Sequence, residues 1–214
     1  MARFRSRFAV PLFLTLATAG TSRAQVQVEL GPVLGYYRPV GSFQSTSATA
    51  VTLPARPRDK AGAALGAAGR VWLGHRFGLE VQVASARSSV PASVPPGGSV
   101  GPTPVRVLIG SAQGTWILAS GPGTRFWVGA GAGIVRHGGA AYASYESTTD
   151  VAGTFGLGTS LRIHGPVRLV AGVTTFLYSF DVQSNGGPTL QHGFQVDPLA
   201  HLSLAWSWPG ERRP

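Results

Sequence analysis

Few residues in this chain are suited to acid–base or nucleophilic chemistry. It contains no cysteine, which excludes disulfides and thiolate metal sites. Its five histidines are spread along the sequence without the spacing of a metal site. A histidine that folding brings close to a serine could still supply a general base and a nucleophile for hydrolysis. The residues that such a reaction could recruit are His137, Ser144 and His192.

A second group of candidates is charged and lies in segments that are otherwise almost free of charge. A charge removed from water must be paired, because an uncompensated buried ion costs several kcal/mol. We therefore expect two glutamates to form salt bridges with some of four arginines. Such a network could act as a plug or gate, or it could simply fill a narrow interior. The residues are Glu29, Arg70, Glu80, Arg125, Arg162 and Arg168.

The elements that position these residues are strands, and the segment 151–180 shows their pattern best. From Val151 to Ile163 apolar residues alternate with small or polar ones, as in a strand with two different faces. The sequence His164-Gly-Pro166 breaks this run, and a second alternating run follows at once. Two such runs joined by a short turn predict a β-hairpin.

The same unit recurs along the chain and predicts eight strands. The connections alternate between long polar loops and short turns, which is typical of an up-and-down barrel of the bacterial outer membrane. The long loops are expected at 39–59, 87–103, 138–149 and 181–193. The strands are expected near 26–36, 61–73, 76–85, 105–118, 125–137, 151–163, 167–180 and 194–208.

Composition indicates which face of these strands points outward. Charged residues make up only 12% of the chain, and Lys60 is its single lysine. A soluble, lipocalin-type barrel would carry charges on most outward positions, whereas a membrane barrel has an apolar exterior and a polar interior. We therefore predict an all-β fold, an eight-stranded antiparallel up-and-down transmembrane β-barrel. A soluble periplasmic barrel that binds an apolar ligand is the alternative.

Residues 1–24 are predicted to be a secretory signal peptide. Arg3, Arg5 and Arg7 precede a short apolar run, and Ser22-Arg-Ala24 resembles a cleavage site. The apolar run is far shorter than the ~20 residues of a membrane-spanning helix. The formal net charge is +10, but the basic residues outside the leader are scattered. Nucleic-acid binding, which needs clustered basic residues, is therefore not expected.

Aromatic residues are expected to form girdles at the two membrane interfaces, where an apolar ring with a polar edge is stabilised. Trp72 is an exception, because its position in the alternation places it inside the barrel. The outward aromatic residues are Tyr36, Phe77, Trp116, Phe126, Trp206 and Trp208.

Residues 25–208, from the leader cleavage site to the last aromatic strand, resemble the OmpA/OmpX-type eight-stranded outer-membrane β-barrels. The resemblance rests on architecture and implies a monomeric outer-membrane protein that contacts lipid and holds no cofactor. It also implies insertion by the barrel-assembly machinery, although a short polar tail at 209–214 follows Trp208. The expected role is non-enzymatic: envelope integrity, binding through the loops to an unknown partner, or minor solute passage. Some such barrels modify lipids, so an outer-membrane deacylase or acyltransferase is the alternative.

Overall fold

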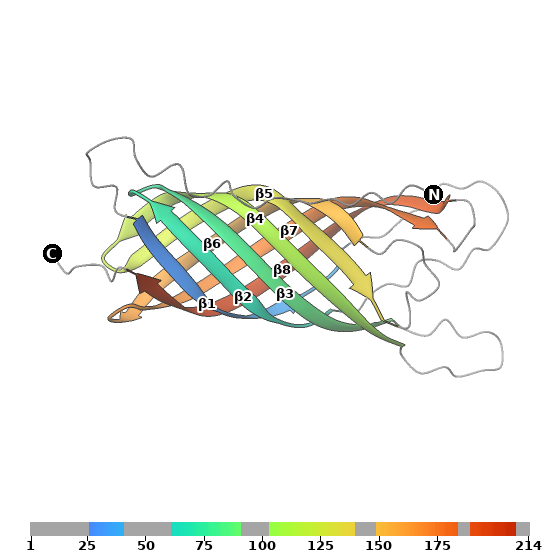
Figure 1. The fold of residues 1–214 in the computed structure, drawn as a ribbon, viewed down its shortest axis with the longest axis horizontal. Helices are drawn as coiled ribbons and strands as arrows, with labels where there is room; N and C mark the ends of the chain where they lie inside the picture. The colour runs from blue at the N-terminus through green and yellow to red at the C-terminus, as the bar shows by residue number, and fades with distance from the viewer. Residues whose placement is uncertain (1–25, 41–60, 91–102, 140–148, 184–188, 209–214) are drawn as a thin grey trace, which may run out of the picture.

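The computed structural model describes residues 26–40, 61–90, 103–139, 149–183 and 189–208. The proposed leader and the C-terminal tail lie outside these ranges. The described chain forms one closed antiparallel barrel in which each strand pairs with the next (Figure 1). The strands are β1 (Val26–Tyr37), β2 (Gly62–Leu73), β3 (Phe77–Val90), β4 (Thr103–Gly121), β5 (Thr124–Gly138), β6 (Thr149–His164), β7 (Val167–Gln183) and β8 (Thr189–Trp208).

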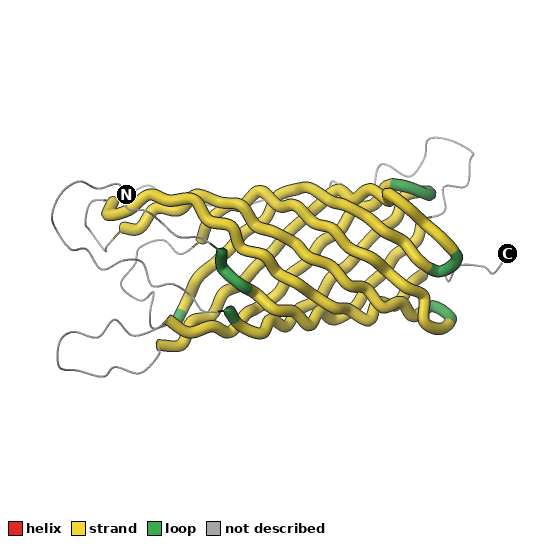
Figure 2. Tube along the Cα trace, turned by 180° about the vertical axis from the view of Figure 1, so that it is seen from behind, coloured by secondary structure: helices red, strands yellow, loops and turns green. Residues whose placement is uncertain are grey.

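The first and last strands close the barrel. Val28 pairs with Trp208 and Tyr37 pairs with Leu199, so β1 is bonded along its length to both β2 and β8. Three short turns lie together at one end of the barrel (Figure 2). Each contains a glycine with positive φ (Gly74, Gly123 or Gly165), a conformation that costs glycine little. We call this end the short-turn end and the opposite one the long-loop end.

The apolar face of the strands points outward and the polar face points inward, which confirms the membrane-barrel prediction. Leu157 on β6 and Leu204 on β8 point outward and are 52% and 55% exposed. Glu80 on β3 points inward and is only 1% exposed. A soluble barrel would bury the leucines and expose the glutamate, so the apolar exterior identifies a surface made for hydrocarbon. Within the described ranges, no helix is long and apolar enough to cross a membrane.

The strands extend further at the long-loop end than the sequence predicts. Segments expected in loops, such as 87–90 and 181–183, belong to β3 and β7. Asp181, for example, pairs with His192 in the ladder between β7 and β8, although both residues were expected to lie in the 181–193 loop. In β3 the backbone pairing continues through Arg87, Ser88 and Ser89, which break the apolar alternation, because the ladder needs no apolar side chains once it leaves the hydrocarbon. The loops expected at 87–103 and 181–193 are therefore too long, and the ends of the 138–149 loop also lie in strands.

Candidate functional site in the barrel lumen

A charge network fills the lumen at the short-turn end. Glu29 on β1 lies between two arginines, with its Oε1 atom 3.3 Å from Arg125 Nη1 and 3.5 Å from Arg168 Nε. Arg70 on β2 and Glu80 on β3 are cross-strand partners and form a second ion pair, in which Arg70 Nε donates to a Glu80 carboxylate oxygen. Both glutamates are buried, so their charges are balanced by these guanidinium groups and not by bulk water.

Further hydrogen bonds fix the arginines at this end. Arg125 Nη2 donates to Gln27 Oε1 over 2.6 Å, and Arg168 Nη2 donates to the Gly123 carbonyl oxygen over 3.0 Å. Arg162 is half-buried at the edge of the group, and its backbone N–H donates to the same carbonyl over 2.7 Å. The structure thus gathers all six predicted charged residues at one end of the barrel.

Two tryptophans complete this layer. The Arg70 guanidinium lies 5.0 Å from the centre of the Trp127 ring, and that of Arg125 lies 5.6 Å from the Trp72 ring. Such cation–π contacts stabilise a guanidinium that has lost water. The inward position of Trp72 is therefore explained by packing in the lumen. Trp127 was not singled out from the sequence, although it directly follows the outward-facing Phe126.

The middle of the lumen is narrow because large side chains lie against glycines. A Cβ atom on Gly156 would lie 2.6 Å from Gln113 Oε1, and one on Gly172 would lie 2.9 Å from His201 Cε1. Thr174 Oγ1 on β7 lies 3.4 Å from Gln82 Oε1 on β3, a weak hydrogen bond across the barrel. These contacts leave the interior filled by side chains, as expected for eight strands.

A buried carboxylate at the long-loop end was missed in the sequence. Asp197 on β8 accepts hydrogen bonds from the Tyr37 hydroxyl, from the Tyr178 hydroxyl at 2.7 Å and from Gln195 Nε2 at 2.7 Å. Tyr37 and Asp197 are 160 residues apart, so only the closure of the barrel brings them together. Strand alternation could have indicated these two residues, because it places the Asp197 side chain inside the barrel. It places Tyr37 inside as well, since Tyr37 directly follows the outward-facing Tyr36.

The long-loop half of the lumen is also more apolar than predicted. The sequence predicts a polar interior. In the structure, a cluster of buried apolar side chains surrounds the Asp197 hydrogen bonds. The hydrogen bonds from Tyr37, Tyr178 and Gln195 satisfy the Asp197 carboxylate oxygens inside this otherwise apolar wall. The cluster includes Val105, Val107, Ile109, Val135, Phe176 and Leu199.

Of the three residues considered for hydrolysis, only His137 has its side chain in the described part of the chain. His137 is 1% exposed inside the lumen, with its ring centre 6.4 Å from that of Tyr178. Ser144 and the side chain of His192 lie outside the described part of the chain. Among the described residues there is also no group of three or more His, Asp or Glu side chains that could hold a metal ion.

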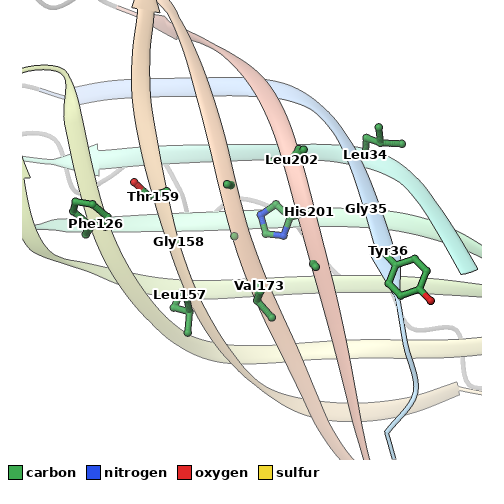
Figure 3. A pocket seen from close by; sticks show the side chains of 13 residues that line it. Leu34, Gly35, Tyr36, Phe126, Leu157, Gly158, Thr159, Val173, His201 and Leu202 are labelled. Atoms are coloured by element: carbon green, nitrogen blue, oxygen red, sulfur yellow. The ribbon is translucent and has the colours of Figure 1, made fainter. Parts of the chain in front are cut away.

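The outer surface is apolar, with aromatic residues at both ends. The six aromatic residues expected outside are all exposed: Tyr36, Phe77, Trp116, Phe126, Trp206 and Trp208. Small residues on β6, β7, β8 and β1 leave a hollow of about 650 Å³ between larger ones (Figure 3). Leu34, Leu157 and Leu202 border it. The hollow is lined almost entirely by apolar atoms and faces the side where hydrocarbon would lie, so it offers no chemistry of its own.

Comparison with known proteins supports the fold. No protein-family profile matches the sequence, and no curated protein sequence matches it. Among solved structures, the outer membrane protein OprG from Pseudomonas aeruginosa is 9% identical, with a TM-score of 0.56 over 86% of this chain and 97% of that one. The outer membrane protein AlkL is 15% identical, with a TM-score of 0.54 over 99% of this chain and all of that one. The chain therefore has the eight-stranded, OmpA/OmpX-like β-barrel fold of small outer-membrane proteins.

Proposed function

We propose that this protein is a non-enzymatic barrel of the bacterial outer membrane that acts as a structural and surface-binding element. The filled lumen is the observation that carries this proposal. The charged layer with its two tryptophans, the glycine-flanked middle and the Asp197 hydrogen bonds occupy successive levels of the interior. A barrel filled in this way contributes its outer surface and loops, rather than an open channel, to the membrane.

Catalysis is less well supported by the same geometry. A lipid-modifying enzyme needs a nucleophile and base that an acyl ester can reach. His137 is buried inside the wall among the residues of the long-loop half, not on the membrane face. We expect no release of fatty acid when the refolded protein is incubated with lipopolysaccharide. Release that a His137→Ala variant abolishes would contradict the non-enzymatic proposal.

Minor solute passage is the second candidate, and the apolar long-loop half of the lumen favours it. For a solute to cross, however, the charged layer would have to move, and its buried ion pairs would have to separate. Breaking a buried ion pair typically costs about 3–5 kcal/mol. Passage is therefore expected to be rare compared with that through an open pore.

Conductance across a planar bilayer tests the proposal. The wild-type barrel should show no sustained conductance, whereas Trp72→Ala with Trp127→Ala should raise it by removing two large side chains from the lumen. The matched control is Trp206→Ala with Trp208→Ala, which removes the same volume from the outer face, where the rings lie 5.8 Å apart. A wild-type barrel that conducts continuously would contradict the closed lumen.

The cellular setting is part of the same proposal. We expect delivery by the N-terminal leader, insertion by the barrel-assembly machinery and a monomeric barrel surrounded by outer-membrane lipid. Fractionation with heat-modifiable gel mobility tests this setting. Recovery of the folded protein from the soluble periplasm without detergent would support the ligand-binding alternative instead.

A further inference from the structure

Three arginines form a basic patch on the outer face of the barrel at its long-loop end. Arg87 on β3 and Arg106 on β4 are direct cross-strand partners. Arg136 on β5 is the partner of Leu108, two residues along β4 from Arg106. All three side chains are exposed and share the outward face. Direct partners have Cβ atoms about 5 Å apart and diagonal ones about 7–8 Å, so three guanidinium groups can reach one ligand.

The patch lies where the apolar surface ends. Along β3 the outward residues before Arg87 include Val81 and Val83, and on β5 Ile134 directly precedes Arg136 in the outward series. Arginines at this boundary can lay their stems on apolar surface while their charged ends reach the headgroups. Within the described strands, every exposed outward-facing arginine lies at the long-loop end, which faces the cell exterior in barrels of this architecture.

The charges of this patch are not balanced within the described part of the protein. Like charges directly opposite each other on a sheet are destabilising, as Arg87 and Arg106 are here. Arg106 Nε donates to the Ser85 hydroxyl over 2.9 Å, a neutral partner that orients the guanidinium without neutralising it. None of the three arginines forms an ion pair with a residue in the described ranges. An external anion would remove this repulsion.

We propose that Arg87, Arg106 and Arg136 bind the phosphate groups of a phosphorylated glycolipid, of the lipopolysaccharide class, in the outer leaflet. Guanidinium groups bind phosphate oxygens through paired, charge-assisted hydrogen bonds. The acyl chains of the same molecule would lie along the apolar wall below, beside Val83 and Ile134. The inference requires the barrel to lie in the outer membrane, but it does not depend on whether the lumen is closed.

Binding to purified lipids tests the proposal. We would measure the affinity of the detergent-purified, folded barrel for lipopolysaccharide, for the same lipopolysaccharide without its lipid A phosphates, and for phosphatidylglycerol vesicles. The wild type should prefer the phosphorylated glycolipid. Arg87→Gln with Arg106→Gln should bind it roughly thirtyfold more weakly, as expected when two arginines at an anionic surface are lost.

The matched control is Arg38→Gln with Arg76→Gln, which removes two exposed arginines outside the patch. This variant should bind the glycolipid with an affinity close to that of the wild type. Heat-modifiable gel mobility would show that both variants are folded.

Three results would overturn the proposal. They are equal binding of lipopolysaccharide by both variants, wild-type binding that is unchanged when the lipid A phosphates are removed, and equal wild-type affinity for lipopolysaccharide and phosphatidylglycerol. None of these binding results depends on conductance through the barrel. Failure of the glycolipid proposal is therefore distinguishable from failure of the closed-lumen proposal.

Discussion

Removing one partner of the buried Arg70–Glu80 pair is expected to destabilise the barrel strongly. The side chains are 3% and 1% exposed, and they are paired with each other across β2 and β3. Glu80→Leu leaves the Arg70 guanidinium in the lumen without a carboxylate. Breaking a buried pair in this way costs about 3–5 kcal/mol. The ratio of folded to unfolded protein should therefore fall at least about a hundredfold, since each 1.4 kcal/mol is a factor of ten.

A double-mutant cycle shows whether this loss comes from the ion pair. Replacing both residues, as Arg70→Met with Glu80→Leu, removes the unbalanced charge and leaves an apolar pair of similar size. Such replacements are often neutral or stabilising in other proteins. Here a small loss is expected, because the contact between Arg70 and Trp127 also disappears. The double variant should thus be more stable than Glu80→Leu alone.

Reversible unfolding by urea in lipid vesicles, followed by tryptophan fluorescence and gel mobility, is the assay. Gln82→Leu is the matched control, because it removes a neutral lumen side chain whose hydrogen bond to Thr174 is long at 3.4 Å. Its cost should be at most about 1.5 kcal/mol. The reasoning would be refuted if the losses from Glu80→Leu and Arg70→Met simply added in the double variant, since additive losses indicate no coupling.

Three further predictions concern the lumen and the outer face, and the same unfolding assay tests each of them. Gly158→Ala should cost about 1–3 kcal/mol, because its Cβ would lie 2.4 Å from Trp127 Cζ2 and 2.9 Å from the Ala171 carbonyl oxygen. Trp127→Leu should relieve part of this loss, and no relief would contradict the contact with Trp127. Leu157→Arg should cost about 2–4 kcal/mol if Leu157 lies near the bilayer centre, whereas a neutral effect would place it in water. Tyr37→Phe should cost about 1.5–3 kcal/mol, because Asp197 loses a donor, and a loss below about 0.5 kcal/mol would contradict that hydrogen bond.

The fold could be predicted from the sequence because strand alternation is a local property. Leu157 and Thr154 lie on opposite faces for the same reason that any two strand residues of opposite parity do. The low charge of the chain then identified the face that meets hydrocarbon. The inward position of Trp72 followed from the same rule, even though a tryptophan is more often expected at a membrane interface.

Features that depend on pairing across the closed barrel could not be predicted in this way. The ends of β7 and β8 are set by backbone pairing of residues such as Asp181 and His192. The hydrogen bond between Tyr37 and Asp197 requires the contact between the first and last strands. Even for the charged layer, parity indicated which residues face inward, but only the register assigned Glu80 to Arg70.

The central claim is that hydrocarbon contacts every second residue of each strand, whereas the residues between them face the lumen. The absence of native cysteine allows a scan of single cysteines along β6, each carrying a spin label, in lipid vesicles. Labels at 151, 155, 157 and 161 should be accessible to oxygen dissolved in the bilayer, whereas labels at 152, 154 and 160 should be shielded. The opposite pattern, or no difference between the two sets, would contradict the claim.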